Sequence, residues 1–367
     1  DRRRDRRARC GILKASAGAG GMLKTVPKEG FPDLLQLRMH SQSAAHDAAK
    51  HPARHSTHTL VMAEAFGYVV QVYRVFILSL RQSGYSGNIT IIAPPNRTRA
   101  DAARFLAEQH VNLFTLSGNT TTRRHNADRF IQYAKLCHSG YEYCLAADFR
   151  DVFFQRDPFA AIQSARALRG ADLILPLEPR LLGHDFVNDY FVRKCFGGSV
   201  LQQLTNRSVI CSGVIIGTPA AFAALQRRLV PLAHMCSTDK MSDQAALNYL
   251  VHITSAGSSA GLVDRSSHRP LQIRLQRAGE SFSNTIGIFK GNESTLDFER
   301  VHMDSGIVLN DGGHPSPVVH QYDRLLASSG PRGRFGRTAR LLRFQAIEKA
   351  LGGREAVGNG EWLPQFR

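Results

Sequence analysis

The sequence predicts an α/β fold with a mostly parallel central sheet flanked by helices and a mixed second half. Short apolar runs typical of buried strands recur about every thirty residues, at residues 60–63, 89–93, 111–115 and 143–147. Helix-like stretches separate them, at residues 68–83, 99–109 and 126–138. Strands that alternate with helices indicate βαβ units and a parallel sheet, with ligands expected at the carboxyl ends of the strands.

The second half of the chain has a looser pattern, which favours mixed rather than parallel strands. After a strand-like run at 172–177 comes a polar and aromatic insertion at 181–204. The remaining expected elements are an apolar strand at 209–217, helices at 219–229 and 242–251, and short strands at 286–289, 307–310 and 318–320.

Composition predicts an enzyme-sized globular protein, because 367 residues with 43% hydrophobic side chains can bury a large core. The net charge of +17 is concentrated in the tails: residues 1–58 carry 12 Lys and Arg against 5 Asp and Glu, and residues 330–367 carry 8 against 3. Such tails are typical of solvated linkers, so no nucleic-acid partner is expected. We predict a basic, low-complexity stem at 1–58, a catalytic domain at 59–329 and a basic tail with some helix-forming sequence at 330–367.

Cysteines and glycosylation sequons bear on the cellular compartment. Six cysteines contain no C-x-x-C pair, which disfavours a zinc cluster and leaves disulfide pairing open. Five N-x-S/T sequons exceed the roughly one or two expected by chance and favour the secretory pathway; they begin at Asn88, Asn96, Asn119, Asn206 and Asn292. No apolar stretch reaches the ~20 residues that span a bilayer. We therefore expect a Golgi or secretory-lumen protein whose N-terminal membrane anchor is missing from this sequence, with a cytoplasmic protein as the alternative.

An acidic turn is the principal candidate for chemistry. Asp148 and Asp151 lie three residues apart directly after an apolar strand, and Arg150 lies between them. A turn at the end of a strand can bring the two carboxylates together, and such a pair suits Mg²⁺ or Mn²⁺ with positions left open for diphosphate oxygens. The structural alternative is that Arg150 pairs with a neighbouring Asp and that Asp157-Pro158 opens a turn or helix.

Four segments in order carry a family resemblance: LAADFRDVFFQRDPF, VICSGVIIGT, SDQAALNYL and VVHQYDR. Together they resemble the retaining glycosyltransferases of the GT-A fold, a class that includes glycogenin-like enzymes and bacterial lipopolysaccharide galactosyltransferases. They look especially like those of a eukaryotic group of glycosyltransferases with a D-x-R-D-V-x-F-Q-x-D-P-F run. The resemblance covers roughly residues 59–326 and implies a GT-A-type nucleotide-diphospho-sugar transferase fold.

The resemblance implies a metal site made of Asp148, Asp151 and His320. One extra residue separates the two acids here compared with the family's D-x-D motif. Arg150 within the turn would then lie beside a donor phosphate and take over part of the cation's role, which puts strict metal dependence in doubt. An imidazole next to two carboxylates suits Mn²⁺ better than Mg²⁺. His314 is a weaker competitor for the histidine position.

The resemblance also implies a donor-sugar pocket. In the class, a pair matching Asp243 and Gln244 contacts the sugar hydroxyls near the reacting carbon; the structural alternative makes Asp243 an N-terminal helix cap. Ser212 and Gly213 would line the pocket, unless Gly213 only marks a bulge. Arg129 would lie near the donor nucleotide, unless it forms a salt bridge on a helix surface.

The predicted function is therefore transfer of a hexosyl or pentosyl group from a nucleotide-sugar donor to a glycan, protein or lipid hydroxyl, with retention. Residues 63–64 at the end of the first strand would form the nucleoside pocket, and Phe186, Tyr190 and Phe191 an acceptor wall. The main rival is a catalytically silent protein of the same fold that binds a glycan or nucleotide. A nucleotidyltransferase is less favoured, because no glycine-rich phosphate loop follows the first strand.

Overall fold

The computed structural model describes residues 58–94, 96–116, 125–164, 169–236, 241–254, 262–280, 282–286, 301–302 and 307–321. All of them belong to one compact unit, His55–Arg367. The predicted stem up to residue 57 and the predicted basic tail lie outside the described residues, so the proposed domain limits stay predictions. No helix in the described part of the chain is long and apolar enough to cross a membrane.

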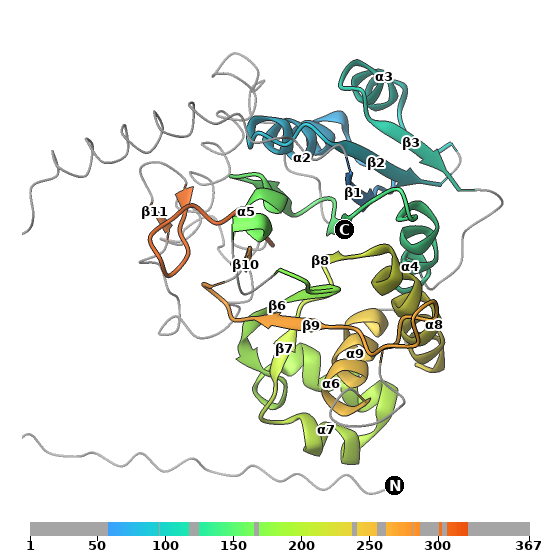
Figure 1. Ribbon diagram of the computed structural model, residues 1–367, viewed down its shortest axis with the longest axis vertical. Coiled ribbons are helices and arrows are strands. Elements are labelled where there is room, and N and C mark those ends of the chain that lie inside the picture. Colours follow the sequence, from blue (N-terminus) through green and yellow to red (C-terminus); the bar gives the residue numbers. More distant parts are fainter. Residues whose placement is uncertain are drawn as a thin grey trace, which may run out of the picture. The chain divides into compact units, whose positions relative to one another are not determined.

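A mixed sheet in the order β3-β2-β1-β4-β8-β6-β7, with β9 paired to β6, forms the centre of the fold (Figure 1). The pairs β1–β2, β2–β3, β1–β4 and β6–β9 are parallel, and β4–β8, β6–β8 and β6–β7 are antiparallel. This confirms the predicted α/β class with a parallel first half and a mixed second half. The strands are β1 (Thr59–Glu64), β2 (Asn88–Ala93), β3 (Asn112–Thr115), β4 (Tyr143–Asp148), β6 (Leu173–Leu181), β7 (Ser208–Ile210), β8 (Val214–Gly217) and β9 (Ile273–Gln276).

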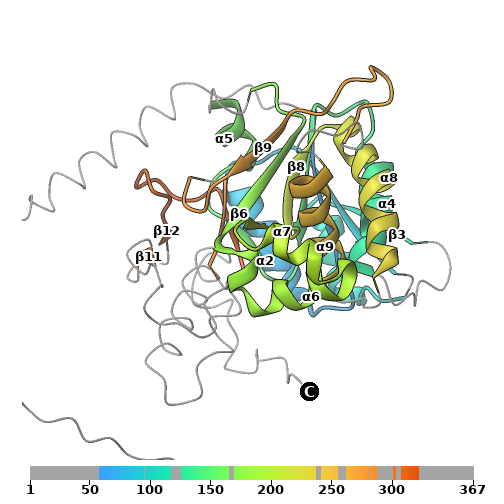
Figure 2. The ribbon, with the colours of Figure 1, turned by 90° about the horizontal axis from the view of Figure 1, so that it is seen from below.

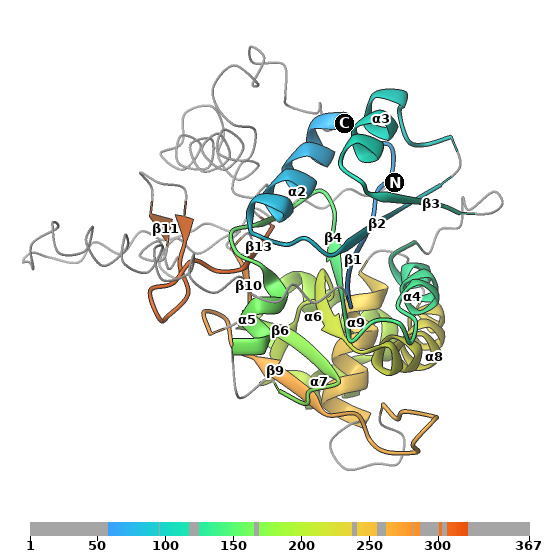
Figure 3. The same cartoon turned by 45° about the horizontal axis from the view of Figure 1, so that its top comes forward.

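Helices cover both faces of this sheet (Figures 2 and 3). Because side chains alternate along a strand, Val61 and Ala63 pack with α2 and α3, while Leu60 and Met62 pack with α4, α8 and α9 on the opposite face. Both faces of β1 are therefore covered by helices, which explains its continuous apolar sequence. The helices are α2 (Val70–Gln82), α3 (Ala100–Glu108), α4 (His125–Leu136), α5 (Pro158–Ser164), α8 (Pro219–Met235) and α9 (Ser242–Tyr249).

The insertion at 181–204 folds as a helical layer beside α9. It consists of a 3₁₀ turn (Leu182–His184), α6 (Phe186–Phe196) and α7 (Gly198–Leu204). Asp185 begins α6, because its side chain accepts hydrogen bonds from the backbone N–H groups of Val187 and Asn188. After α9 the chain continues as one π-helical segment, Leu250–Thr254.

The expected single strand at 209–217 is wrong. The chain instead forms β7 and β8, separated by Cys211, Ser212 and Gly213. The break occurs because β7 pairs only with β6, whereas β8 inserts between β4 and β6 and must follow a different line. The three residues of the break consequently lie at the end of β4, where Gly213 O accepts a hydrogen bond from Asp148 N at 2.6 Å.

A second, three-stranded sheet in the order β10-β13-β5 brings distant segments together. It contains β5 (Val152–Phe154), β10 (Ser283–Thr285) and β13 (Val318–His320), with β13 antiparallel to β5. The strand expected at 286–289 stays a prediction, because residues 287–289 lie outside the described residues; β10 ends directly before it, at Thr285. A two-stranded ribbon joins β11 (Val301–His302) to β12 (Ile307–Val308).

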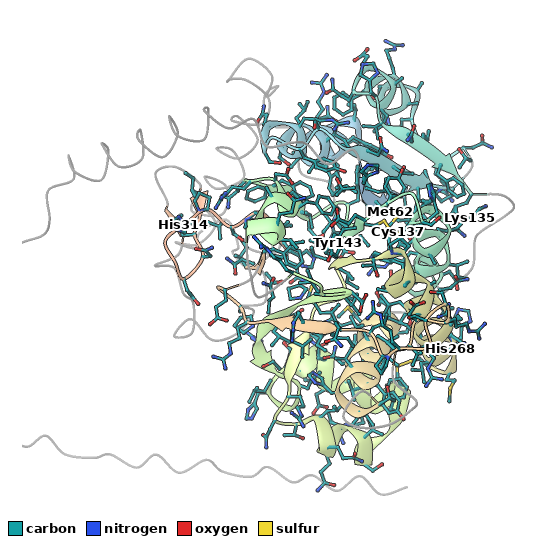
Figure 4. The ribbon with its side chains drawn as sticks, viewed as in Figure 1. Met62, Lys135, Cys137, Tyr143, His268 and His314 are labelled. Carbon is teal, nitrogen blue, oxygen red and sulfur yellow. A yellow bond between two sulfur atoms is a disulfide. The ribbon has the colours of Figure 1, made fainter. Side chains whose placement is uncertain are left out.

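Two disulfides connect elements of the fold. One joins Cys137, labelled in Figure 4, to Cys144, so the end of α4 is tied to the start of β4. The other joins Cys195 in α6 to Cys236 at the end of α8. Cys211 is buried and free. The sequence had left this pairing open.

Candidate active site

The candidate site lies where the order of the sheet reverses. From β1 the chain adds β2 and β3 on one side, and then returns to place β4 on the other side of β1. In α/β sheets, ligands bind at the carboxyl ends of the strands at such a switch point. Here those ends are Glu64 of β1 and Asp148 of β4, which are paired in register.

The acidic turn follows directly from Asp148. Its second residue, Phe149, is buried, with its ring centroid 4.7 Å from that of Tyr73 and 4.9 Å from that of Phe76. This aromatic cluster fixes the turn to α2. Asp151 is itself buried, and its backbone oxygen accepts a hydrogen bond from Gln321 N at 2.7 Å.

His320 reaches the turn from the other end of the chain. It is the last residue of β13, opposite Val152 in the antiparallel pairing with β5, and its side chain is 1% exposed. Its Nε2 lies 3.3 Å from Asp148 Oδ2 and 3.8 Å from Asp151 Oδ1. One ligand atom from each of the three residues lies within 4.8 Å of the others.

This cluster fits a divalent cation. Octahedral bonds of ~2.1 Å place neighbouring ligands about 3 Å apart and opposite ones about 4.2 Å apart, close to the separations found here. His320 Nε2 is buried and makes no hydrogen bond within the described part of the chain. A Cβ on Gly213 would lie 2.4 Å from His320 Cε1 and 2.6 Å from Asp148 Oδ2, so only glycine leaves room for the cluster. His314, labelled in Figure 4, is exposed in the turn before β13 and takes no part.

Arg129 connects this cluster to α9. Its guanidinium donates to Asp148 Oδ1 at 2.5 Å, to Asp243 Oδ2 at 2.7 Å and to Ser212 O at 3.1 Å. The side chain is buried, so the alternative of a salt bridge on the helix surface is wrong. The alternative of Asp243 as a helix cap is also wrong, because Met241 occupies the N-cap position of α9 and Asp243 lies in the first turn.

The acids of the site have pKa values shifted in opposite directions. Burial raises the pKa of Asp148, but Arg129 and His320 outweigh it, so that the pKa of Asp148 is lowered. Burial and the nearby Asp148 raise the pKa of Asp243 against the opposing effect of Arg129. Burial also raises the pKa of Glu64 to about 8, so Glu64 is mostly protonated at pH 7 and can donate a hydrogen bond.

Gln244 is held in one orientation by neighbours on both sides of its amide. Its Oε1 accepts from the backbone N and the Oγ of Ser212, both at 3.2 Å. Its Nε2 donates to Asn188 Oδ1 at 2.8 Å and lies 3.5 Å from Glu178 Oε1. All four residues are buried. Gln244 is therefore a fixed polar group beside Asp243 rather than a mobile one.

Arg150 stands at the outer side of the turn. Its side chain is 42% exposed, and its Nη2 lies 3.9 Å from Asp151 Oδ2. The predicted pairing of Arg150 with a neighbouring Asp is thus present, and the expected helix after Asp157-Pro158 is α5. The Arg150 side chain therefore stays partly exposed beside the acidic turn.

The structure brings together the residues expected at the donor and metal sites, while their chemical roles stay predictions: Arg129, Asp148, Arg150, Asp151, Ser212, Gly213, Asp243, Gln244 and His320. Sequence reasoning missed Asn188 and Glu178, which contact Gln244, and the place of Cys211, whose Sγ lies 3.3 Å from His320 Nδ1. Asn188 follows the Asp185 cap by three residues inside the insertion, and that capping pattern was the available signal. Nothing in the spacing linked Cys211 to His320, 109 residues away.

Comparison with known proteins finds solved structures that are similar at low sequence identity. No protein-family model matches the chain, and no curated protein matches it. One similar solved structure is the galactosyltransferase LgtC in complex with donor and acceptor sugar analogues, at 13% identity, covering 78% of this chain and 95% of that one with a TM-score of 0.43. Another is apo glycosyltransferase GlyE of Streptococcus pneumoniae, at 14% identity, covering 80% of this chain and 62% of that one with a TM-score of 0.45.

Proposed function

We propose that this protein transfers a sugar from a nucleotide-sugar donor to an acceptor hydroxyl. The observation that carries the proposal is the convergence of Asp148, Asp151 and His320 at the switch point of the sheet. Two carboxylates and an imidazole with open positions suit a cation that also binds a diphosphate. The neighbouring buried pair of Asp243 and Gln244 supplies polar groups at the place where a donor sugar would lie.

Asp148, Asp151 and His320 would hold the cation, with Mn²⁺ favoured over Mg²⁺ because one ligand is an imidazole. When bound, the cation neutralises the charge of the departing nucleoside diphosphate. Arg150 supports this function from the solvent side, since its partly exposed guanidinium can approach a phosphate. Glu64, at the end of β1, would donate a hydrogen bond to the nucleoside.

The donor sugar would lie over Ser212 and Gly213 and against α9. The buried guanidinium of Arg129 pairs with both Asp148 and Asp243. It therefore orients a proposed metal ligand, Asp148, and an acid that can accept hydrogen bonds from sugar hydroxyls, Asp243. Gln244 presents a fixed amide next to it. These contacts restrict the reacting carbon to one orientation, which is how positioning lowers the barrier of group transfer.

We propose retention of the anomeric configuration. The bond from C1 of the sugar to the diphosphate oxygen breaks, the acceptor oxygen bonds to C1 on the same face, and the acceptor proton moves to the departing phosphate. The Asp243 carboxylate is already engaged by Arg129, which disfavours its use as a covalent nucleophile. NMR analysis of the product's anomeric proton tests this, and an inverted product would refute it.

The acceptor is proposed to be a glycan, protein or lipid hydroxyl that approaches over α6. Phe186 and Tyr190 lie one helical turn apart and are 85% and 46% exposed, whereas Phe191 packs against the core of the insertion. The acceptor wall is accordingly reduced to Phe186 and Tyr190. Phe186→Ala should raise the KM for the acceptor without changing donor binding.

Nucleotide binding provides the direct test. Thermal unfolding is measured with UDP and with GDP, each in Mn²⁺ and in EDTA. We expect stabilisation by one nucleotide in Mn²⁺ only, and its loss in His320→Ala. His314→Ala, which removes an exposed histidine outside the cluster, should respond like wild type. Equal responses of His320→Ala and wild type would refute the metal site.

A catalytically silent binding protein is the second candidate. Its support is that Arg129 already pairs with Asp148 and Asp243, and Arg150 with Asp151, so each acid has an arginine partner without a metal ion. This candidate predicts nucleotide or glycan binding that is the same in Mn²⁺ and in EDTA, with no turnover of any nucleotide sugar.

We further propose that the protein works in the secretory lumen. Both disulfides would be reduced in the cytosol, where thiols are kept reduced. Protein isolated with its thiols alkylated should yield peptides that contain Cys137–Cys144 and Cys195–Cys236. Recovery of four alkylated thiols at these positions would contradict the assignment.

A further inference from the structure

We infer that Cys211 is a positioning residue for the metal site: its sulfur accepts the Nδ1 proton of His320 and thereby leaves Nε2 free to bind a cation. The inference rests on the proposed metal-dependent function and adds a residue that none of the sequence motifs assigns. The contacts of Cys211 Sγ, its burial and the orientation of the His320 ring support this role.

The sulfur is an acceptor in this structure. Cys211 Sγ lies 3.4 Å from the backbone N of Gly213, and that N–H can only donate. The same sulfur lies 3.3 Å from His320 Nδ1. The Gly213 N–H thus donates to the thiol, and the Nδ1–H tautomer of His320 would donate to it as well. Cys211 N is itself fixed by a hydrogen bond to Pro176 O at 3.0 Å.

The position of the ring proton decides whether His320 can serve as a ligand. With the proton on Nδ1, the lone pair of Nε2 faces Asp148 and Asp151, at 3.3 and 3.8 Å. With the proton on Nε2 alone, an N–H would point into the cluster and exclude a cation. Metal-binding histidines usually donate their second ring N–H to a carboxylate, carbonyl or water, and here a thiol takes that place.

The thiol has no other evident task. Cys211 is buried, it is outside both disulfides, and in the described part of the chain it contacts the site only through Gly213 and His320. Burial removes it from solvent reagents, so a nucleophilic role is disfavoured. A small apolar residue would fill the same space, and what distinguishes cysteine is its capacity to accept these two hydrogen bonds.

The test compares Cys211→Ser, which keeps an acceptor, with Cys211→Val, which has similar volume and none. Mn²⁺ affinity of the whole chain is measured by isothermal titration and by the EPR signal of free Mn²⁺. We expect Cys211→Val to bind Mn²⁺ about 10–100-fold more weakly, as is typical when the partner of a ligand histidine is removed. Cys211→Ser should stay within a few-fold of wild type. Val209→Ala, a truncation of a buried side chain two residues away, should keep wild-type affinity.

The outcomes separate this inference from the proposed function. If wild type binds Mn²⁺, His320→Ala does not, and Cys211→Val binds like wild type, the role of Cys211 is refuted and the metal site stands. If wild type itself binds no Mn²⁺, both fail. ¹⁵N spectra of histidine in the Mg²⁺-loaded protein add a second readout: the proton should reside on Nδ1 of His320, and a proton on Nε2 would overturn the inference.

Exposed sequons carry a second inference, which rests on the proposed secretory location: we propose that Asn96 and Asn206 carry N-linked glycans. Asn96 is exposed at the turn after β2 with φ 60°, and Asn206 is exposed in the turn between α7 and β7. Each Nδ2 would lose a proton and bond to C1 of a sugar that is supplied by a lipid-diphosphate-linked donor. The bond from C1 to the phosphate oxygen breaks, and the lipid diphosphate leaves. Asn88 differs, because its Nδ2 donates to Tyr141 Oη at 3.2 Å and its sequon partner Thr90 is buried.

Secretion of the whole chain from eukaryotic cells tests these sites. Asn96→Gln and Asn206→Gln should each remove one glycan-sized step in mass, and the step should disappear from wild type after enzymatic deglycosylation. Asn88→Gln is the matched control and should leave the mass pattern unchanged. Unaltered patterns in both the Asn96 and Asn206 variants would refute the proposal.

Discussion

Replacement of Gly213 by alanine should strongly weaken cation binding while it preserves the fold. The added Cβ would meet His320 Cε1 at 2.4 Å and Asp148 Oδ2 at 2.6 Å. Carbon atoms in contact normally lie about 3.5–4.0 Å apart, so the ring must retreat by more than about 1 Å. Metal–ligand distances in protein sites stay within about 0.2 Å of their standard values. We therefore expect Mn²⁺ affinity to fall by at least about 100-fold, more than the loss of a partner of a ligand histidine causes.

The cost in stability should be moderate, because overpacking of a buried site costs about 1–3 kcal/mol. Calorimetry in EDTA would show this as a decrease in Tm, and titration calorimetry would give the Mn²⁺ affinity. Gly198→Ala is the control, since a Cβ there meets nothing closer than Arg193 Nη1 at 3.8 Å. Wild-type Mn²⁺ affinity in Gly213→Ala would refute the argument that the cation site requires the empty space above this residue.

Three further predictions concern stability. Arg129→Met should lower the free energy of unfolding, measured by chemical denaturation, by about 3 kcal/mol. This is the low end for a broken buried ion pair, because the side chain of its partner Asp148 is 31% exposed. Lys135→Met, on the exposed side of the same helix, should have little effect, and similar losses in both variants would contradict the prediction. Burial lowers the pKa of His252, so the unfolded chain binds more protons than the folded chain below about pH 6.5. The free energy of unfolding of wild type should therefore decrease as the pH falls from 7 to 5. His252→Gln should lose less stability over that range, and parallel curves of unfolding free energy against pH for the two proteins would count against the prediction. Removal of Cys195–Cys236, with a separation of 41 residues, should cost about 4 kcal/mol against about 2.5 kcal/mol for Cys137–Cys144, with a separation of 7, as measured with paired serine variants; equal costs would show that chain entropy is not the cause.

Parallel strands made the first half of the fold predictable. Both faces of β1, β2 and β4 are covered, so each reads as an apolar run at the expected place. In the second half, strands are short and paired with distant segments. β5 has three residues and follows the acidic turn, so no periodic pattern could identify it. The break at Cys211 was hidden for a related reason, since β7 and β8 are equally apolar and only their different neighbours separate them.

The candidate site was predictable as far as its residues occur in motifs. Asp148, Asp151 and His320 were identified by the segments around them, and the structure brings them together. The environment of Arg129 could not be predicted, because a helix position gives no information on whether its outer end meets solvent or two acids. Contacts such as Gln244 with Asn188 depend on how the insertion packs on α9, which no local pattern encodes.

The position of His320 on β13 also determines when the site can form. The acidic turn and β5 leave the ribosome more than 160 residues before β13, and the large sheet can assemble without β13. The three residues therefore meet only after β13 has paired with β5 across a long stretch of chain. Contacts between residues so far apart in sequence form slowly. A chain in which β13 has not docked would present two carboxylates without His320, so the proposed cation site can be complete only after this strand has joined β5.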